Sequence, residues 1–466
     1  MKKILFPFLI SLFLVACSDN EQNTNQVESE KPENQKQDNS TLDSQKLKHV
    51  AWSENATIYE ANIRQMTPEG TFKALENKLG NIRDLGVTTI WLMPVQPIGK
   101  LNRKGGMGSY YSVKDYTAVN PEFGTMDDFK SLVDKAHKME MKILIDWVAN
   151  HTAWDHKWTI GHPEWFTKDS TGNFVPPVPD WSDVIDLNYD NMQMRAAMID
   201  AMRFWVVETD IDGFRCDVAG MVPTDFWNNV RIALDAEKPV FMLAEAEQTD
   251  LHQHAFDMTY GWEFMHIINH IASGDSTLGS IDRYMQREQK RFDKNDYRMY
   301  FLTNHDENSW NGTIAERYGA AEKPYAVLAF TINGMPLIYS GQEYGNDKRL
   351  EFFEKDNPHL ANPEIEDFYK TLMHLNKNNS ALWNGNYGGD YHRIKTTADE
   401  HIFALKRQKD ESVVVSVVNL SDKPITFKFE TSENIILADA FTSEEVFING
   451  DVKMTLPPYG FRVLEK

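Results

Sequence analysis

Cysteine is nearly absent from this chain. Only two cysteines occur among its 466 residues, Cys17 and Cys216. If Cys17 is modified in the way that its surroundings predict below, no disulfide can form within the chain. With 41% hydrophobic residues, the chain can nevertheless bury a large core.

Positive charge is also scarce. The chain has 48 Lys and Arg against 69 Asp and Glu, which gives a formal net charge of -21. Nucleic-acid binding depends on clustered cations that neutralise phosphates, so this balance argues against such a partner. A neutral polymer such as a polysaccharide is not excluded. Aromatic residues are plentiful, with 12 Trp, 17 Tyr and 26 Phe, and sugars stack their C–H faces on exposed rings.

Long hydrophobic runs are missing, and the one apolar stretch at the N-terminus is short. Lys2 and Lys3 precede an apolar run over residues 4–15, which is too short for the roughly 20 residues of a membrane span but fits a signal peptide. The run ends in Leu-Val-Ala-Cys17, which resembles a bacterial lipobox, where the cysteine is lipidated and becomes the mature N-terminus. We predict a lipoprotein signal peptide over residues 1–17; the alternative is an ordinary signal peptide with a chance cysteine.

Residues 18–48 contain no aromatic residue and are rich in Asn, Gln, Glu, Asp, Ser and Lys. Such a segment cannot bury enough apolar surface to fold, so we predict a disordered tether between the membrane and the folded part of the chain. Asp19 and Glu21 resemble surface-export signals of some Gram-negative lipoproteins. The expected location is the outer membrane, facing the periplasm or the cell surface.

Beyond residue 50, short apolar segments alternate with helical patterns, which is typical of βα units and a parallel sheet. The spacing of Thr125 and Asp128, for example, indicates a capping box that starts a helix. Eight candidate strands can be counted, at residues 57–63, 88–93, 142–147, 212–217, 239–245, 255–259, 299–304 and 335–340. Eight such strands predict a TIM (β/α)8 barrel, which takes about 250 residues, over residues 49–384.

Two stretches fall outside this repeat. Residues 151–190 are too long for one helix and rich in Trp, Pro, Asp and Gly. Long insertions at the carboxyl ends of barrel strands usually build active sites, so we predict an inserted loop domain after the third strand. Residues 385–466 show short strands at 401–405, 412–418, 425–429 and 460–463, which predict a C-terminal antiparallel β-sandwich.

Four acidic residues end, or closely follow, predicted barrel strands. Asp146 closes the third strand, Asp217 the fourth and Glu245 the fifth, and Asp306 follows the seventh. The carboxyl ends of barrel strands form the face at which TIM-barrel enzymes work. We therefore expect the four side chains to converge at one site.

Clustered carboxylates suit glycoside hydrolysis, in which one acid protonates the leaving oxygen and a second carboxylate attacks the anomeric carbon or activates water. Arg215 precedes Asp217 by two residues on the same strand face, and its charge favours an ionised Asp217. The apolar neighbours of Glu245 favour its protonated form. Because adjacent strands lie about 4.8 Å apart, the two carboxyl groups can sit roughly 5–5.5 Å apart, the separation found in retaining enzymes.

These motifs together resemble the α-amylase family, glycoside hydrolase family 13. Four segments resemble its four main regions: Asp146-Trp-Val-Ala-Asn150-His151, Gly213-Phe-Arg215-Cys-Asp217, the segment around Glu245, and Asn304-His305-Asp306. Three flanking segments are similar too: Gly86-Val-Thr-Thr-Ile-Trp-Leu-Met-Pro94, the stretch from Tyr111 to Thr125, and Gly334-Met-Pro-Leu-Ile-Tyr-Ser-Gly-Gln-Glu343. The matches run in order from about residue 57 to residue 345.

The resemblance implies roles for the matched residues. Asp217 would be the nucleophile, Glu245 the acid/base and Asp306 the transition-state stabiliser. The residues that would hold the sugar next to the cleaved bond are Arg215, His151, His305, the stacking Tyr111 and the supporting Asp146.

A calcium ion is also implied by the resemblance. The family's calcium site uses the Asn of the first region, here Asn150, and an Asp that aligns near Asp186 or Asn188, so the predicted metal ligands are Asn150 and Asn188. Calcium takes six to eight oxygen ligands. Many members carry a Lys-His pair three and four residues after the nucleophile; Gly220 and Met221 stand there instead, which removes usual aglycone-side contacts and bears on one backbone calcium ligand.

The predicted function is hydrolysis of α-1,4-glucosidic bonds in starch, glycogen or malto-oligosaccharides. A transglycosylase, or an α-1,6-acting enzyme of the neopullulanase type, is the alternative within the family, and Val218 after the nucleophile is a residue type seen in such relatives. A glucan-binding lipoprotein without catalysis is the alternative from another class. The intact set of carboxylates with Arg215 speaks against it, and the oligomeric state stays open.

Overall fold

The computed structural model describes residues 47–360, 362 and 364–466. The predicted signal peptide with Cys17, and the predicted tether up to residue 46, lie outside the described residues. Among the helices of the described part, none is long and apolar enough to cross a membrane.

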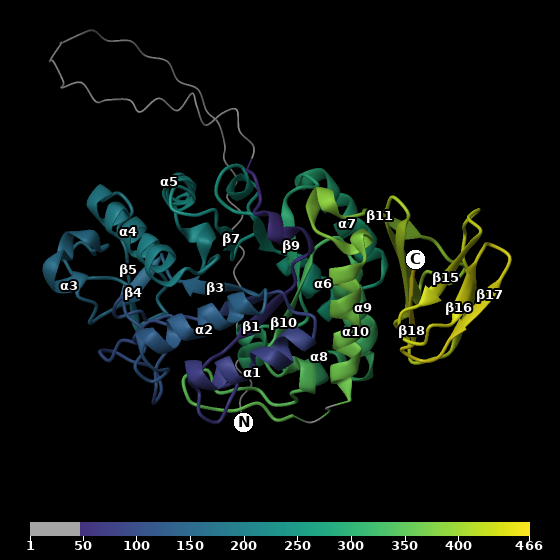
Figure 1. Cartoon of the computed structure of the whole chain (residues 1–466), viewed down its shortest axis with the longest axis horizontal. Helices are drawn as coiled ribbons and strands as arrows, with labels where there is room; N and C mark the ends of the chain where they lie inside the picture. The colour runs from purple at the N-terminus through teal and green to yellow at the C-terminus, as the bar shows by residue number, and fades with distance from the viewer. Residues whose placement is uncertain (1–46, 361, 363) are drawn as a thin grey trace, which may run out of the picture. The chain divides into compact units, whose positions relative to one another are not determined.

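Eight parallel strands close into a barrel in the order β1-β10-β9-β8-β7-β6-β3-β2. Figure 1 labels β1, β3, β7, β9 and β10. The strands are β1 (Ile58–Ala61), β2 (Thr89–Leu92), β3 (Lys142–Trp147), β6 (Gly213–Cys216), β7 (Phe241–Ala244), β8 (Met258–Tyr260), β9 (Tyr297–Tyr300) and β10 (Met335–Tyr339). The predicted TIM barrel is confirmed. Two strand positions were wrong: the sixth begins and ends later than expected, and the seventh already leaves the sheet after Tyr300, so Asp306 follows its strand at a greater distance.

Alternation along the strands decides which side chains enter the barrel. On β7, Phe241 and Leu243 belong to the core inside the barrel, whereas Met242 and Ala244 belong to the core between strands and helices. Because successive side chains of a strand point to opposite faces, the next inward position after Leu243 is Glu245. The same alternation directs Asp146 inward after Leu144 on β3.

Helices follow the strands and cover the barrel from outside. They are α1 (Phe72–Asp84), α2 (Met126–Lys138), α4 (Met192–Thr209), α5 (Thr224–Asp235), α6 (Trp262–Ala272), α7 (Gly279–Arg291), α8 (Ile314–Tyr318), α9 (Glu322–Thr331) and α10 (Ile365–Asn378). The predicted capping box is present at α2: the Thr125 side chain accepts from the Asp128 N–H, and the Asp128 carboxylate accepts from the Thr125 N–H. Phe129, Leu132, Val133 and Ala136 form the buried side of that helix.

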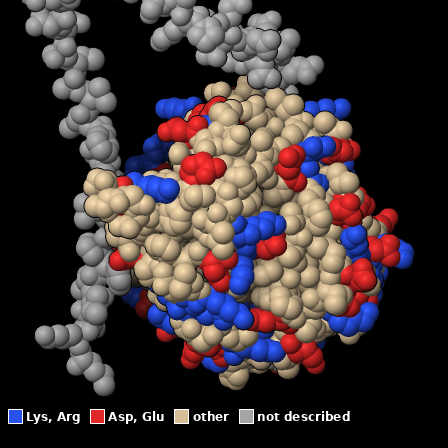
Figure 2. Space-filling model, turned by 90° about the vertical axis from the view of Figure 1, so that its left-hand side faces the viewer, with Lys and Arg blue, Asp and Glu red and all other residues tan. Residues whose placement is uncertain are grey.

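The segment inserted after β3 contains an antiparallel pair, β4 (His151–Ala153) with β5 (Val184–Asp186), and the short helix α3 (Trp158–Gly161). Trp158 and Trp165 pack edge to face with ring centroids 5.1 Å apart, so these two rings serve packing within the insertion. Figure 2 views the side of the molecule that carries α3 and α4, where Lys and Arg are interspersed with Asp and Glu.

The C-terminal strands form two antiparallel sheets, ordered β11-β12-β13-β18-β15-β16 and β14-β17. The strands are β11 (Asp390–Ile394), β12 (Ile402–Lys409), β13 (Ser412–Asn419), β14 (Ile425–Lys428), β15 (Ile435–Asp439), β16 (Glu445–Ile448), β17 (Lys453–Leu456) and β18 (Phe461–Glu465). A separate core, with Val415, Phe427 and Leu437 among its members, lies between them. Helix α9 packs against β13 and β18; α9 and β18 are labelled in Figure 1.

Candidate active site

Three of the predicted carboxylates come from neighbouring strands. Strands β3, β6 and β7 are adjacent, with Asp146 opposite Arg215 and Cys216 opposite Ala244. The Glu245 N–H donates to the Cys216 carbonyl at 3.0 Å. Asp217 and Glu245 therefore stand one position beyond paired residues of adjacent strands, as the sequence predicts.

Arg215 is the centre of this cluster. Its Nη1 lies 3.0 Å from Asp146 Oδ1 and 3.1 Å from Asp217 Oδ1, and its Nη2 lies 2.9 Å from Glu245 Oε1. Its Nε donates to the Tyr260 hydroxyl at 3.0 Å. The guanidinium and Asp146 are fully buried, so one planar cation holds three carboxylates in a fixed arrangement.

The charges in this cluster do not balance, because one cation faces three carboxylates. Burial and the charge of Glu245 raise the pKa of Asp217 well above its ordinary value, against the opposing effect of Arg215. Burial likewise raises the pKa of Asp146. The sequence predicted that the charge of Arg215 favours an ionised Asp217. The structure adds burial and crowding, so the cluster binds protons at higher pH than free carboxyl groups do.

The surroundings of Glu245 differ from those expected of its sequence neighbours. Its Oε1 contacts Arg215, and its Oε2 accepts from the Val218 N–H at 2.8 Å. The side chain points into the barrel mouth while Ala244 points outward, so the apolar flanks predicted to favour its acid form do not surround the carboxyl group. Val218 donates from a left-handed conformation, φ 37°, which is strained for a β-branched residue and is typical of functional sites.

A second group of polar side chains lies beside the first. The Tyr111 hydroxyl lies 2.8 Å from His305 Nε2 and donates to Asp146 Oδ2 at 3.1 Å. His305 Nε2 lies 3.3 Å from Asp306 Oδ2, and its Nδ1 lies 2.5 Å from Glu60 Oε1. Burial opposes the charged imidazolium, but Asp306 and Glu60 raise the pKa of His305 to about 9.

The ring of Tyr111 is more buried than expected for a residue that stacks on a sugar. Its ring is 9% exposed and stacks on His305 with centroids 5.3 Å apart. The carboxylate of Asp306 is the most open of the four, with 38% of its side chain exposed. The structure therefore brings Asp146, Asp217, Glu245, Asp306, Arg215, His305 and Tyr111 together.

Glu60 is a site residue that the sequence analysis did not include. It lies on β1, fully buried, and its only side-chain partner among the described residues is His305. Burial raises its pKa above the usual value. The sequence gives a weaker signal here than for the other four, because Glu60 is acidic but lies inside the first predicted strand and not at its end.

Trp91 and Tyr260 were missed as well. The Trp91 indole donates to Asp146 Oδ2 at 3.1 Å, and the Tyr260 hydroxyl accepts from Arg215. Both side chains are large apolar strand residues that sequence patterns assign to the core, which they also occupy. Only their polar atoms, placed by the fold, connect them to the site.

His151 lies at the edge of the site. Its Nδ1 is 3.2 Å from Asn150 Nδ2, and its ring packs against Trp181 at 5.5 Å. Burial lowers its pKa to about 3, so the ring is neutral. Within the described part of the chain, its side chain makes no hydrogen bond or ion pair to the four carboxylates, and its predicted contact with the sugar stays a prediction.

The predicted calcium ligands do not by themselves fit a calcium ion. Asn150 and Asn188 supply neutral amides, and Asn188 Oδ1 already accepts from the Asp190 N–H at 3.0 Å. Across residues 47–466 as described, no group of three or more His, Cys, Asp or Glu side chains could hold a metal. Two amide oxygens fall short of the six to eight oxygens that calcium takes.

The structure shows why a small residue stands at Gly220, the first of the two positions where many family members carry Lys-His. A Cβ on Gly220 would lie 2.4 Å from Gln248 Nε2, so the Gln248 side chain occupies the space that a larger residue would need. Met221 is 48% exposed.

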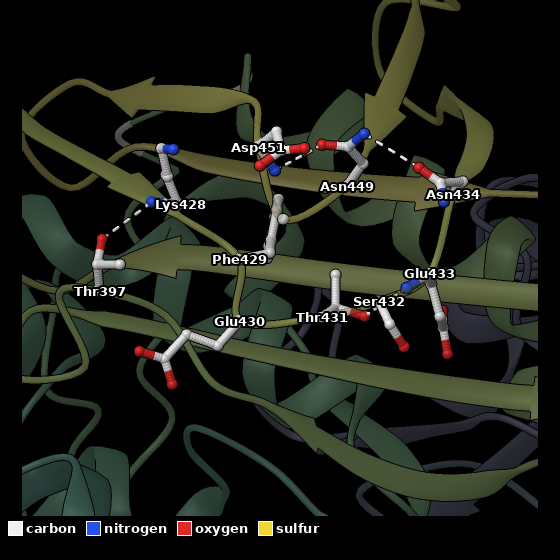
Figure 3. A pocket seen from close by; sticks show the side chains of 11 residues that line it. Thr397, Lys428, Phe429, Glu430, Thr431, Ser432, Glu433, Asn434, Asn449 and Asp451 are labelled. Carbon is white, nitrogen blue, oxygen red and sulfur yellow. Dashed lines mark hydrogen bonds between the residues drawn. The ribbon is translucent and has the colours of Figure 1, made fainter.

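A polar hollow of about 440 Å³ lies elsewhere, on the C-terminal sheets (Figure 3). Thr397, Lys428 and Asn449 are among its lining residues. The side chain of Asn449 accepts from the Asp451 N–H at 2.6 Å and donates to Asn434 at 3.0 Å. None of the predicted site residues lines this hollow, so it is separate from the carboxylate cluster.

A buried arginine between clustered carboxylates, at the carboxyl end of a TIM barrel, defines a site of the glycoside hydrolase class. The α-amylase catalytic-domain family matches this chain in two overlapping stretches, residues 23–173 and 160–374. The chain therefore belongs to the α-amylase family.

Three relatives illustrate the similarity. An α-amylase of Haloarcula japonica is 26% identical over 397 residues, or 81% of this chain; the chain spans 57% of that relative's length. Neopullulanase 2 of Thermoactinomyces vulgaris is 27% identical over 443 residues, covering 85% of this chain and 70% of the relative. The crystal structure of a maltogenic α-amylase from Thermotoga neapolitana is 30% identical, with a TM-score of 0.81 over 88% of this chain and 98% of that one.

Proposed function

We propose that this protein is a retaining glycoside hydrolase that cleaves α-1,4-glucosidic bonds in starch, glycogen or malto-oligosaccharides. The observation that carries the proposal is the single guanidinium of Arg215 in contact with both Asp217 and Glu245. It fixes two carboxyl groups from adjacent strands beside each other, and a retaining mechanism uses a pair about 5–5.5 Å apart.

In the first step, Asp217 attacks the anomeric carbon while Glu245 gives its proton to the leaving glucosidic oxygen. The bond to that oxygen breaks, and a covalent glucosyl–Asp217 intermediate forms. In the second step Glu245 takes a proton from water, whose oxygen attacks the same carbon and releases Asp217. One proton must reside in the cluster before the first step, and three carboxylates around one cation favour such a proton.

Asp306 and His305 act on the sugar rather than on the bond directly. Asp306 is the most exposed carboxylate of the site, and His305 stays protonated over a wide pH range. Together they can hold sugar hydroxyls as the ring distorts, since His305 Nε2 lies only 3.3 Å from Asp306 Oδ2.

Proton NMR of the first product formed tests the stereochemistry. Retention predicts an initial α-anomer; an initial β-anomer would overturn the roles given to Asp217 and Glu245. Asp217→Asn should keep the fold and glucan binding and lower kcat by about 10⁴-fold or more. Full activity of this variant would exclude Asp217 as nucleophile.

An α-1,6-acting or transglycosylating enzyme is the second candidate. Val218, which follows the nucleophile position, and the similarity to a neopullulanase favour it. A product profile from starch, pullulan and maltotriose separates the two: cleavage of pullulan at α-1,6 bonds supports the second candidate, and products longer than the substrate indicate transglycosylation. A glucan-binding protein without catalysis would give no products.

We further propose that lipid on Cys17 holds the protein at the outer membrane of a Gram-negative cell. The lipobox-like sequence and the polar residues behind it support this. Cys17→Ser should move the protein from the membrane to the soluble fraction of lysed cells. Unchanged membrane association would contradict the anchor.

The calcium ion remains a prediction carried by the resemblance at Asn150. If an ion is bound, it ties the inserted segment to the barrel and stabilises the fold without taking part in the chemistry. A melting temperature that falls on chelation and recovers with added calcium would support the ion. An unchanged melting temperature would agree with the poor donor set and count against it.

A further inference from the structure

Trp310 is a large aromatic side chain left open beside the candidate active site. It is 54% exposed and lies in η6 (Glu307–Asn311), a single π-helical turn that directly follows Asp306. Such turns are rare and often occur at functional sites. Within the described part of the chain its indole N–H has no hydrogen-bond partner, so it is available as a donor.

The ring of Trp310 continues a row of rings that begins at the site. Phe352 stacks on Tyr111 with centroids 6.3 Å apart and planes at 21°, and it lies 6.2 Å from His305. Trp310 lies 5.4 Å from Phe352 and 5.9 Å from Phe353. A cluster made only for packing would bury its largest ring. Here the largest ring is the most open, at the outer end of the row.

The row is held firmly. Asn308, in the same turn as Trp310, donates to the Lys348 carbonyl at 3.1 Å and accepts from the Leu350 N–H at 2.9 Å. The Met107 N–H donates to the Phe353 carbonyl at 3.0 Å. The loops that follow β2, β9 and β10 thus fix one another, which reduces the entropy lost when a ligand binds.

The strands place the row on one side of the site. Trp310 follows β9 and Phe352 follows β10, whereas Asp217 and Glu245 follow β6 and β7. In the order β1-β10-β9-β8-β7-β6-β3-β2, β10 lies across the barrel from β6. The row begins at Tyr111, which the resemblance makes the platform of the sugar attacked by Asp217, so the row lies toward the part that stays on the enzyme.

We propose that Trp310, with Phe352 behind it, is a stacking subsite for a glucosyl unit of the retained part of an α-glucan, beyond the unit held at Tyr111. This rests on the proposed function. The flat indole accepts the C–H face of a glucose ring, and its free N–H can donate to a hydroxyl. The subsite makes the enzyme prefer substrates long enough to reach Trp310.

The test compares Trp310→Ala with Trp310→Phe and with Tyr387→Ala. Tyr387 is a matched control, because it is also an exposed aromatic residue, 42% exposed, and lies outside the site. The ratio of kcat/KM for maltoheptaose to that for maltotriose should fall about tenfold in Trp310→Ala, which corresponds to about 1.4 kcal/mol. Trp310→Phe should recover most of the ratio, and Tyr387→Ala should leave it unchanged.

Calorimetric titration with maltoheptaose, in an Asp217→Asn background, gives a second measurement that does not need turnover. Trp310→Ala should raise the Kd about tenfold there. A ratio and a Kd both within twofold of the parent would overturn the subsite, as would an equal loss in Tyr387→Ala. If the parent binds maltoheptaose through Trp310 but hydrolyses neither sugar, the subsite stands and the proposed hydrolysis fails.

Discussion

Arg215 in the barrel and Arg407 in the C-terminal sheet are both completely buried, yet their surroundings are opposite. Arg215 faces the carboxylates of Asp146, Asp217 and Glu245. Arg407 donates instead to three backbone carbonyls, those of Ile332 at 2.8 Å, Gly389 at 3.0 Å and Trp383 at 3.3 Å.

The difference appears in the pKa of the two side chains. Burial disfavours the charge of both, but the carboxylates around Arg215 raise its pKa well above the ordinary value. Around Arg407 burial prevails and lowers the pKa to about 10. A buried cation is therefore no sign of a catalytic site in itself. Its partners decide whether it organises reacting groups or joins parts of the fold.

The same substitution at both positions tests this contrast, and the larger effect on catalysis is expected at the barrel. A lysine at position 215 keeps the positive charge, but its single ammonium group replaces a planar guanidinium that has several N–H donors. It cannot hold Asp217 and Glu245 at the same time. We expect Arg215→Lys to lower kcat/KM by about 100-fold, measured on maltoheptaose. A loss below threefold would mean that charge alone organises the site.

Arg407→Lys should affect stability instead of catalysis. Its three carbonyl acceptors belong to residues after α9, after α10 and before β11, so the side chain joins the barrel helices to the sheet. A lysine cannot reach all three, and an unpaired buried carbonyl costs about 1–3 kcal/mol. We expect the free energy of unfolding in urea to fall by about 2 kcal/mol while kcat stays the same. A fall in kcat as large as that of Arg215→Lys would contradict the purely structural role of Arg407.

The two arginines also show where prediction from the sequence stops. Arg215 was recognisable, because it lies two residues before an acidic strand end and the alternation of a strand places both on one face. Arg407 carries no such pattern, since its partners are backbone carbonyls from distant segments. The eight barrel strands could be counted for a similar reason, as each is a short apolar run with a local boundary.

What the sequence missed depends on distant contacts. Glu60 joins the site only because the barrel closes and sets β1 two strands away from β9, which brings His305, after β9, against it. The C-terminal strands β11, β15, β16 and β17 were not predicted, since each is only four or five residues long and exposed positions interrupt its buried or partly buried ones. The predicted charge state of Asp217 was incomplete because sequence proximity reveals Arg215 but not the burial of the whole cluster.

The smallest expected effect is a pH dependence of the protein's stability. The barrel site around Arg215 should contribute to it, and the site around Arg407 should not. His305 is faced by Glu60 on β1, by Asp306 after β9, by Tyr111, and by Arg215 on β6, whose charge opposes its own. No such histidine contacts Arg407 among the described residues. The barrel site should therefore contribute a pH-dependent part of the stability that the Arg407 site does not.

The direction follows from the pKa of His305, which is raised to about 9 in the folded protein and is about 6.5 in an unfolded chain. The stabilisation is complete below pH of about 6.5 and is lost as the pH rises through about 9. Glu60→Gln keeps the shape and removes one charge, so the loss of unfolding free energy between pH 6.5 and 9 should shrink by about 1 kcal/mol. The alkaline limb of kcat/KM should move to lower pH.

Glu288→Gln is the matched control, because Glu288 is also buried and pairs with an arginine, Arg298 at 2.9 Å, rather than a histidine. It should destabilise the protein about equally at both pH values, since it removes a partner of Arg298 and no partner of His305. Urea unfolding of the parent and both variants at pH 6.5 and 9 gives the comparison. If Glu60→Gln keeps the full pH dependence of the parent, the charge of Glu60 does not stabilise the protonated form of His305. Asp306 would then be the carboxylate that raises the pKa of His305.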